Sequence, residues 1–467
     1  MKNGILGIDL GTSGIKLLYN DAKGTHKIRE SYTTRDPDGW WKALCKAARQ
    51  LDFSQLRAIG LSAQVGTYII NGRDYIGWSD PVGQEELQQT LEHFSQQDFL
   101  EEISMPHPQL PSYPLPRLRY IQNHFKPLLR VRMPKDFLID RLTGHMVSDM
   151  YSWRGLANLK TGTYSRRLLQ WLGLDEACLP KLQPPDTVAG LVSPAAARET
   201  GIPLGTPVFT GCNDFFAGLL GTGMLQGGEL FDITGTSEHL GVVTDRLAAF
   251  DSALVSGPYF GRYVQYGVTA SSGAALRMGM LLHNLHNTNL NNSLQTMPPV
   301  FLPYLNGERS PIWDANAKGV FFGINADTTA ETLSYSVLEG VAFSLYHIYE
   351  QMGCPDVQAI TVVGGAGKNP VLNRIKATLF GLPVRTLQQN DVSALGAQIL
   401  AAIGMRLYDD LEQAVFDNCE PGAIFRPDPT KTRLLRNRFA VYKQLYPSLK
   451  PLFTQLTSGG ASDRPDL

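Results

Sequence analysis

Short apolar runs that end in glycine-rich polar turns give the chain its first pattern. The run 5–10 is apolar except for Asp9 and enters the turn Gly11-Thr12-Ser13-Gly14, after which a second apolar run follows at 15–19. Apolar runs of this length between turn residues are typical of buried strands. The pattern predicts a strand, a polar turn and a second strand.

The same pattern returns nearly half the chain later. The run 229–234 leads into Gly235-Thr236-Ser237, and apolar residues resume at 240–243. A repeat at this spacing predicts two similarly built domains, although two three-residue turns can also be alike by chance. We place the boundary at the glycine-dense stretch 221–228, which gives domains 1–221 and 222–467 and a candidate hinge between them.

Strands and helices alternate along the rest of the chain, which predicts an α/β fold. Further strands are expected at 58–62, 207–210 and 359–363, and helices at 40–51, 215–220, 330–352, 370–380 and 437–449.

Composition narrows the function classes. With 43% hydrophobic and 18% charged residues among 467, the chain is an ordinary globular protein, and a net charge of −1 without a basic cluster argues against a nucleic-acid partner. The five cysteines form no C-x-x-C pair, so we expect reduced thiols and neither disulfides nor a zinc site. No signal peptide or membrane span is recognisable, which predicts a cytoplasmic protein without a membrane partner.

The first polar turn is a candidate phosphate-binding loop. Gly11 lets the backbone approach an anion, Thr12 and Ser13 add hydroxyl donors, and Lys16 follows in the next strand. Asp9 would repel phosphate and is better suited to hold Mg²⁺, mainly through water. A hairpin turn without any ligand is the alternative, and the residues alone do not decide between the two.

Two later turns extend this hypothesis to a nucleotide. Gly235, Thr236 and Ser237 repeat the donor pattern, and the cluster 364–369 offers a flat backbone for a purine where a helix begins at Pro370. Other nucleotide motifs fail. Asn369 follows Lys368 where a P-loop needs Ser or Thr, and Gln226 stands where a dinucleotide fingerprint needs glycine.

Asp214 is the candidate general base. It follows the strand 207–210 and precedes the helix 215–220, so it can take a proton from a substrate hydroxyl or merely cap the helix. Its position alone favours the cap.

These motifs together resemble known proteins. The two phosphate turns and the cluster 364–369 resemble the actin, hexokinase and heat-shock chaperone ATPase superfamily. The segment 301–311, F-L-P-Y-L-N-G-E-R-S-P, resembles the FGGY carbohydrate kinases, especially their xylulokinase-like branch. The segments 112–124 and 319–339 fit two further FGGY signatures, with Arg117, Tyr120 and Thr332 as departures, and the resemblance covers essentially the whole chain.

The resemblance implies two actin-like (ribonuclease H-like) domains with an active-site cleft between them, and an ATP-dependent kinase that phosphorylates a small sugar or polyol. Asp214 matches the catalytic aspartate, which outweighs the cap interpretation. The implied cofactors are ATP and Mg²⁺, with Asp9 and Asp214 at the metal. The implied ATP-binding residues are Gly11, Thr12, Ser13, Lys16, Gly235, Thr236, Ser237, Gly365, Ala366, Gly367, Lys368 and Asn369, and the implied sugar-binding residues are Gln64, Trp78, Asp80 and Asp214.

The departures from the family pattern lie on the sugar side. The run 62–67 lacks the histidine of a Gln-Met-His-Gly run, Phe215 stands where an amide is common, and Pro81-Val82 replace glycine and arginine. We therefore predict that D-xylulose is a poor substrate. The alternatives are a nucleotide-binding regulatory protein that has lost kinase activity and, more remotely, a filament-forming actin relative. The sugar, the phosphorylated hydroxyl and the oligomeric state stay open, with a homodimer among the alternatives.

Overall fold

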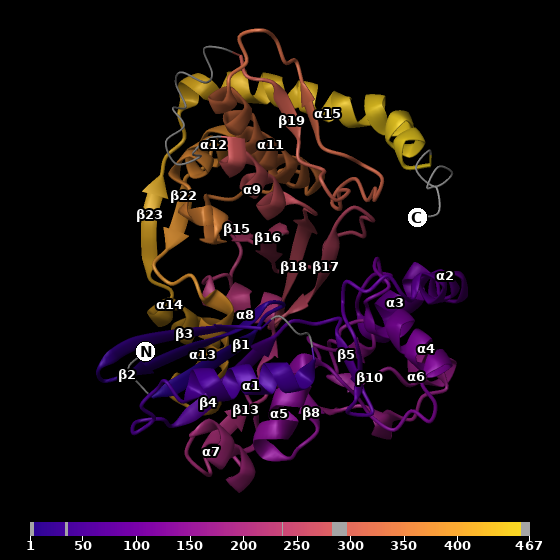
Figure 1. Ribbon diagram of the computed structural model, residues 1–467, viewed down its shortest axis with the longest axis vertical. Helices are drawn as coiled ribbons and strands as arrows, with labels where there is room; N and C mark the ends of the chain where they lie inside the picture. The colour runs from indigo at the N-terminus through magenta and orange to yellow at the C-terminus, as the bar shows by residue number, and fades with distance from the viewer. Residues whose placement is uncertain (1–3, 33–35, 236, 283–296, 459–467) are drawn as a thin grey trace, which may run out of the picture. The chain divides into compact units, whose positions relative to one another are not determined.

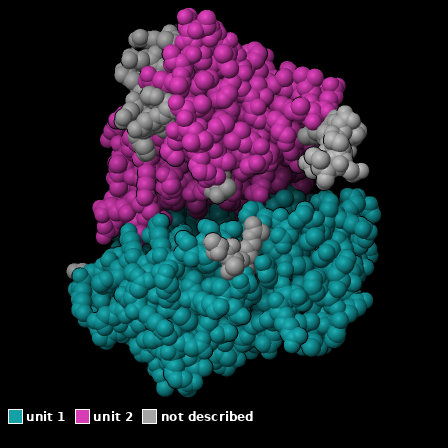
Figure 2. Space-filling model, in the orientation of Figure 1, with its two compact units in different colours: residues 1–225, 257–261, 391–419 teal, residues 226–256, 262–390, 420–467 magenta. Residues whose placement is uncertain are grey.

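The computed structural model describes residues 4–32, 36–235, 237–282 and 297–458. The chain divides into two compact units, coloured separately in Figure 2. Unit 1 comprises residues 1–225, 257–261 and 391–419, and unit 2 comprises 226–256, 262–390 and 420–467. The first crossing, after Leu225, lies in the predicted boundary 221–228. The chain crosses between the units more than once, because residues 257–261 and 391–419 also belong to unit 1. One boundary is therefore not enough to separate the two units.

The main sheet of unit 1 has the order β12-β13-β4-β1-β2-β3. The short strand β14 pairs with β4 as well, on the same side as β13. Its strands are β1 (Ile5–Leu10), β2 (Gly14–Asp21), β3 (Gly24–Ser31), β4 (Ala58–Ala63), β12 (Val188–Leu191), β13 (Pro207–Phe209) and β14 (Cys212–Asn213). Small pairings outside this sheet involve β5 (Tyr68–Ile70), β6 (Asp74–Ile76), β7 (Val131–Arg132), β8 (Val147–Ser148), β9 (Ala157–Asn158), β10 (Thr163–Tyr164) and β11 (Lys181–Leu182).

Helices cover both faces of this sheet (Figure 1). The helices of unit 1 are α1 (Pro37–Ala48), α2 (Gln84–His93), α3 (Gln96–Ile103), α4 (Pro114–His124), α5 (Pro134–Thr143), α6 (Arg166–Leu172), the 3₁₀ turn η1 (Glu176–Cys178), α7 (Pro194–Thr200), α8 (Asp214–Gly221), α13 (Val392–Gly404) and α14 (Leu411–Asn418).

The alternation of β1 decides which residues meet which helices. Leu6, Ile8 and Leu10 belong to the core that includes α1 and α5, whereas Ile5 packs with residues of α13. A Cβ at Gly7 would lie 2.1 Å from the Ala394 carbonyl oxygen of α13. Since side chains alternate along a strand, Asp9 lies on the face that α13 covers.

Unit 2 repeats this topology, with the order β17-β18-β16-β15-β21-β22-β23. In each unit, a hairpin strand (β1 or β15) lies between its antiparallel partner (β2 or β16) and a parallel strand (β4 or β21). The repeat predicted from the sequence is thereby confirmed. The strands are β15 (Glu229–Thr234), β16 (Glu238–Thr244), β17 (Val255–Tyr259), β18 (Arg262–Val268), β21 (Ala359–Gly364), β22 (Val384–Leu387) and β23 (Pro421–Phe425), with a separate pair β19 (Val300–Leu302) and β20 (Val320–Phe322).

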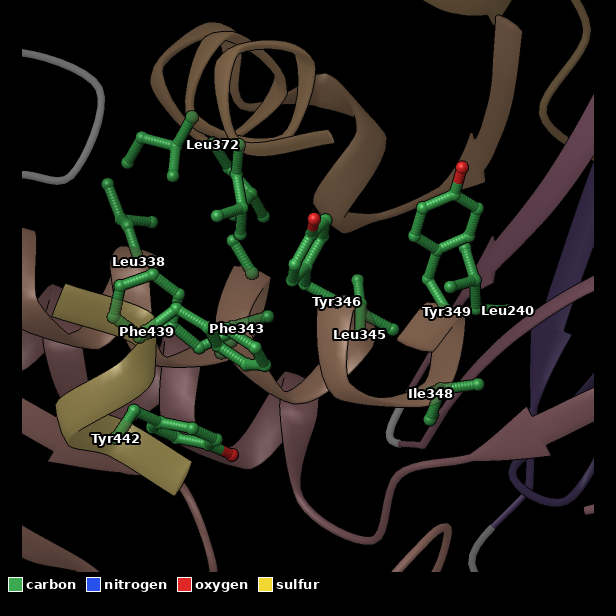
Figure 3. Packing of buried hydrophobic residues seen from close by; sticks show 14 of the residues in the cluster. Leu240, Leu338, Phe343, Leu345, Tyr346, Ile348, Tyr349, Leu372, Phe439 and Tyr442 are labelled. Atoms are coloured by element: carbon green, nitrogen blue, oxygen red, sulfur yellow. The ribbon is translucent and has the colours of Figure 1, made fainter. Parts of the chain in front are cut away.

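The core of unit 2 forms around one long buried helix. The helices are α9 (Ser272–Leu282), α11 (Ala330–Gln351), the 3₁₀ turn η2 (Ala366–Lys368), α12 (Pro370–Phe380) and α15 (Pro429–Ser458). Figure 3 shows Phe343 and Tyr346 of α11 packed with Phe439 and Tyr442 of α15 and with Leu372 of α12. Burial of aromatic side chains on this scale is a large hydrophobic contribution to stability.

Most of the predicted elements are confirmed, several to the residue. The terminal helix is the clearest correction, since it spans Pro429–Ser458 rather than 437–449. Pro447 and Pro451 lie inside it, and internal prolines normally argue against a continuing helix. All five cysteines are free thiols in this structure. Within the ranges that the structure describes, no helix has the length and apolar character needed to span a membrane.

Candidate active site

Three parallel strands of unit 1 end beside one another at the predicted catalytic residues. β1 runs parallel to β4 with Leu10 opposite Ala63, and β14 runs parallel to β4 with Asn213 opposite Ala63. The residues that follow are the turn 11–14 after β1, Gln64 after β4 and Asp214 after β14. The carboxyl ends of parallel strands are where α/β folds place ligands. The topology therefore brings together residues from three distant parts of the chain.

The first turn is held closed by the strands beside it. The Gly11 N–H donates to the Gly14 carbonyl at 3.0 Å, the Tyr32 N–H donates to the Ser13 carbonyl at 3.2 Å, and the Tyr32 hydroxyl donates to the Gly11 carbonyl. Thr12 donates through Oγ1 to Gln64 Oε1 at 3.1 Å. A predicted phosphate residue and a predicted sugar residue are thus in direct contact.

Asp9 is buried and has defined partners for both carboxylate oxygens. Lys16 Nζ lies 3.2 Å from Oδ2, and the Ser62 hydroxyl donates to Oδ1 at 3.0 Å. The attraction of Asp9 raises the pKa of the Lys16 ammonium, so Lys16 stays charged. Ser62 holds Asp9 in place, and no motif in the sequence pointed to this role.

Asp214 is not the cap of α8. The cap is Asn213, whose side chain accepts a hydrogen bond from the Phe216 N–H at 2.9 Å, and Asp214 is the first helical residue. The cap interpretation of Asp214 is therefore wrong. Sequence could not separate the two, because Asn and Asp are equally good caps at adjacent positions.

The environment of Asp214 suits a proton acceptor. Burial, and after it the charge of Asp9, raise its pKa to about 7, although the Phe215 N–H, Lys16 and Arg154 partly oppose this shift. A carboxyl group that titrates near neutral pH accepts a proton far more readily than an ordinary aspartate. Its electrostatic coupling to Asp9 and Lys16 also shows that the three predicted residues lie close together.

Asp9 and Asp214 fit a hydrated Mg²⁺. Mg²⁺ keeps several waters and takes one or two protein carboxylates, and these two carboxylates repel each other enough to affect the pKa of Asp214. Among the residues that the structure describes, no group of three or more His, Cys, Asp or Glu side chains gathers as metal ligands. The site therefore suits an ion that arrives with its own water rather than a fully caged metal.

An open pocket of about 230 Å³, including solvent at its mouth, adjoins the first turn. It is lined by Thr12, Trp40, Gln64, Thr67, Gly77 and Trp78. Two indole rings, two hydroxyls and an amide suit a small polyhydroxylated ligand, because sugars offer both apolar ring faces and hydroxyl groups. Gln64 and Trp78 were predicted here, whereas Trp40 and Thr67 were not.

The loop that carries Trp78 is supported from behind. Asp80 Oδ2 accepts a hydrogen bond from the Gly77 N–H at 2.7 Å, and Thr67 Oγ1 accepts one from the Trp78 N–H at 3.2 Å. The buried Arg117 guanidinium donates to the carbonyls of Gly77 and Asp80 at 3.3 and 3.4 Å. Asp80, predicted as a sugar ligand, thus uses one carboxylate oxygen to shape the loop.

The predicted nucleotide residues assemble in unit 2 by the same topology. β15 and β21 run parallel with Thr234 opposite Gly364, so Gly235 and Gly365 leave neighbouring strand ends. Gly364 has a φ of +94°, and a Cβ there would lie 2.1 Å from the Thr234 carbonyl oxygen. The Ala366 N–H donates to Thr234 Oγ1 at 3.0 Å. Thr236 lies outside the described residues.

The cluster after β21 combines exposed and anchored residues. Gly365 and Lys368 are exposed, and Asn373 Nδ2 donates to the Gly367 carbonyl at 2.7 Å. Asn369 is buried, and its Oδ1 caps α12 by accepting from the N–H groups of Val371 and Leu372. Asn369 therefore sets where the cluster meets the helix, while Gly365 leaves the space above it open.

Comparisons with known proteins show which family the chain matches. Residues 4–221 match the sequence model of the N-terminal domain of the FGGY family of carbohydrate kinases, and residues 232–405 match that of its C-terminal domain. A xylulose kinase of Staphylococcus epidermidis is 27% identical, with 98% of this chain and 99% of the relative covered. A xylulose kinase of Escherichia coli is 28% identical, with 96% and 99% covered.

Solved structures show the same fold. A gluconate kinase and a ligand-bound xylulose kinase, both from Lactobacillus acidophilus, each superpose with a TM-score of 0.84 at 23% identity, with 97% of this chain and 99% of theirs covered. Proteins named for different substrates are thus equally similar to this chain in fold, and specificity depends on the side chains of the site.

Proposed function

We propose, from the premise that this chain belongs to the FGGY family of carbohydrate kinases, that Asp214 is the general base with which it phosphorylates a small sugar or polyol using Mg·ATP. The observation that carries the proposal is the environment of Asp214. Its carboxyl group follows a strand end beside Asp9, is not used as the helix cap, and has a pKa raised to about 7.

In this mechanism the sugar occupies the pocket beside Thr12, Gln64 and Trp78. Asp214 accepts the proton of the attacking hydroxyl as its oxygen bonds to the γ-phosphorus and the bond to the ADP oxygen breaks. Asp9 and Asp214 would hold Mg²⁺ through water. A bound Mg²⁺ would neutralise charge on the phosphates.

The nucleotide is proposed to bind unit 2. Gly235, Thr236 and Ser237 would contact the phosphates, and Gly365, Ala366, Gly367 and Lys368 would pack against the adenosine, with Asn369 capping the helix behind them. Gly11, Thr12, Ser13 and Lys16 of unit 1 would donate hydrogen bonds to the γ-phosphoryl oxygens as this group passes to the sugar hydroxyl. Backbone N–H groups in glycine-rich turns and a lysine ammonium are suitable donors to phosphate oxygens.

A coupled assay of ADP release tests the proposal. The full chain would be screened with Mg·ATP against ketopentoses, deoxysugars, aldonic acids and polyols, with a blank that lacks sugar. We expect release with one group of these substrates at least tenfold above the blank, and the same compound should raise the melting temperature. ATP binding without turnover on any compound would instead favour the regulatory alternative.

A further inference from the structure

A buried lysine connects three elements of unit 2 at the nucleotide residues. Lys376 of α12 donates through Nζ to Asp232 Oδ2 of β15 at 2.5 Å and to Glu238 Oε1 of β16 at 2.6 Å. All three side chains are at most 1% exposed. Neither the sequence motifs nor the proposed mechanism uses them.

Their positions bracket the proposed phosphate turn. Asp232 lies two residues before the end of β15, and Glu238 is the first residue of β16, so the two acceptors stand on either side of Gly235 and Ser237. α12 begins directly after the proposed adenosine cluster. Lys376 belongs to α12, the helix that follows the adenosine cluster. It therefore links this helix to both strands that flank the phosphate turn.

Glu238 extends the network to two further elements. Its backbone N–H donates to Thr269 Oγ1 at 3.1 Å, and its carbonyl accepts from the Thr269 N–H at 2.9 Å. The Ser272 hydroxyl at the start of α9 donates to its carboxylate. The first residue of β16 is thus fixed from three directions.

The two carboxyl groups of this network differ in how readily they ionise. Two carboxyl groups share one ammonium away from water, and leaving both ionised would bury a net negative charge beside the proposed triphosphate. Burial and the neighbouring Glu238 raise the pKa of Asp232 well above its usual range, whereas Lys376 and Ser272 hold the pKa of Glu238 down. Asp232 Oδ1 has no hydrogen-bond partner among the described residues, so no donor stabilises a negative charge on that oxygen.

We propose that Lys376, Glu238 and Asp232 are positioning residues for the nucleotide. By fixing the phosphate turn against the helix of the adenosine cluster, they set the spacing that one ATP molecule must span. The inference rests on the proposed binding of ATP to unit 2. It predicts that loss of the lysine weakens ATP binding by more than a general loss of stability would.

A second buried ion pair in unit 2 provides a matched control. Arg438 of α15 donates to Glu339 of α11 at 2.8 and 2.6 Å, and both side chains are buried. Neither helix carries a proposed nucleotide residue. Removing one partner from either network leaves a buried carboxylate without its cation, so both variants should be destabilised.

The experiment is calorimetric titration of Mg·ATP into the full chain, well below each melting temperature. For Lys376→Met we expect a Kd about tenfold higher than wild type, which is about 1.4 kcal/mol of binding free energy. For Arg438→Met we expect a lowered melting temperature with a Kd within twofold of wild type. An unchanged Kd for Lys376→Met, or an equal rise in both variants, would overturn the inference.

A milder pair of variants keeps the test decisive if Lys376→Met does not fold. Asp232→Asn resembles a protonated carboxyl group, so its Kd for Mg·ATP should stay within twofold of wild type. Glu238→Gln removes the charge partner of Lys376 and should raise the Kd about tenfold. Equal affinities of Glu238→Gln and wild type would overturn the inference, whereas a wild-type chain that binds no ATP would refute the proposed function on which it rests.

Discussion

The proton-accepting capacity of Asp214 depends on pH in a defined direction. Its pKa is raised to about 7, so the carboxyl group is protonated below that pH and cannot act as a base. We predict that kcat/KM for the sugar falls about tenfold per pH unit below about pH 7 and levels off above it. The measurement is a pH profile of sugar-dependent ADP release. A profile that stays flat down to pH 5 would assign the proton transfer to another group.

Substrate choice also depends on single residues. Gln64 lines the pocket in the run 62–67, which lacks the histidine that the family resemblance implies, and Phe215 follows Asp214 at the position where that resemblance implies an amide. A site that lacks these polar partners should discriminate against a sugar that needs them. We predict that D-xylulose is a poor substrate. A kcat/KM of about 10⁴ M⁻¹s⁻¹ or more for D-xylulose would contradict this prediction, because values of that size mark good enzyme–substrate pairs.

The backbone of helix α13 lies very close to the backbone of the elements it packs against in unit 1. A Cβ at Gly396 would lie 1.8 Å from the Ala217 carbonyl oxygen of α8, and one at Gly60 of β4 would lie 1.9 Å from the Ala397 carbonyl oxygen. Because backbone atoms cannot yield as a side chain can, we predict that Gly396→Val lowers the free energy of unfolding by about 3 kcal/mol or more. Denaturant titration checks this prediction. A loss below about 1 kcal/mol would mean that α13 moves without cost.

In the cluster after β21, by contrast, a glycine has open space around it. A Cβ at Gly365 meets no atom within 4 Å, and its backbone has an ordinary helical conformation with a φ of −64°. Gly365→Trp should therefore fold normally and fill the proposed adenosine space. We predict that it weakens Mg·ATP binding by at least tenfold in calorimetry, while Gly365→Ala binds like wild type. Equal affinity of the tryptophan variant and wild type would place the adenosine elsewhere.

For the whole molecule, local patterns predicted the elements better than their assembly. Strands β1 and β15 and helix α12 match the prediction to the residue, because apolar runs, turn residues and Pro370 mark their ends. The return of 391–419 to unit 1 was not predictable in this way. α13 carries small buried residues whose pattern shows a packed helix but not the sheet that it covers.

The residues of the candidate site also differ in how well the sequence predicted them. Asp9, Thr12, Gln64 and Asp214 come from recognisable motifs, and parallel strand ends bring them together. The supporting residues Ser62 and Lys376 gave no such signal, since a serine in a strand or a charged residue in a helix is ordinary in sequence. Arg117 stood out only as a departure from a family signature, which did not indicate its structural role. Their importance comes from burial and hydrogen bonds that only the tertiary structure creates.

The most direct test of the account compares turnover and ATP binding in Asp214→Asn and in the wild-type chain. Asparagine keeps the shape of the side chain but cannot accept the proton, and Asn213 continues to cap α8. We predict that sugar-dependent ADP release falls by on the order of 10²-fold or more, while the calorimetric Kd for Mg·ATP stays within a few-fold of wild type. Activity within a few-fold of wild type, on a sugar that the native chain phosphorylates, would contradict the account of Asp214 as the general base.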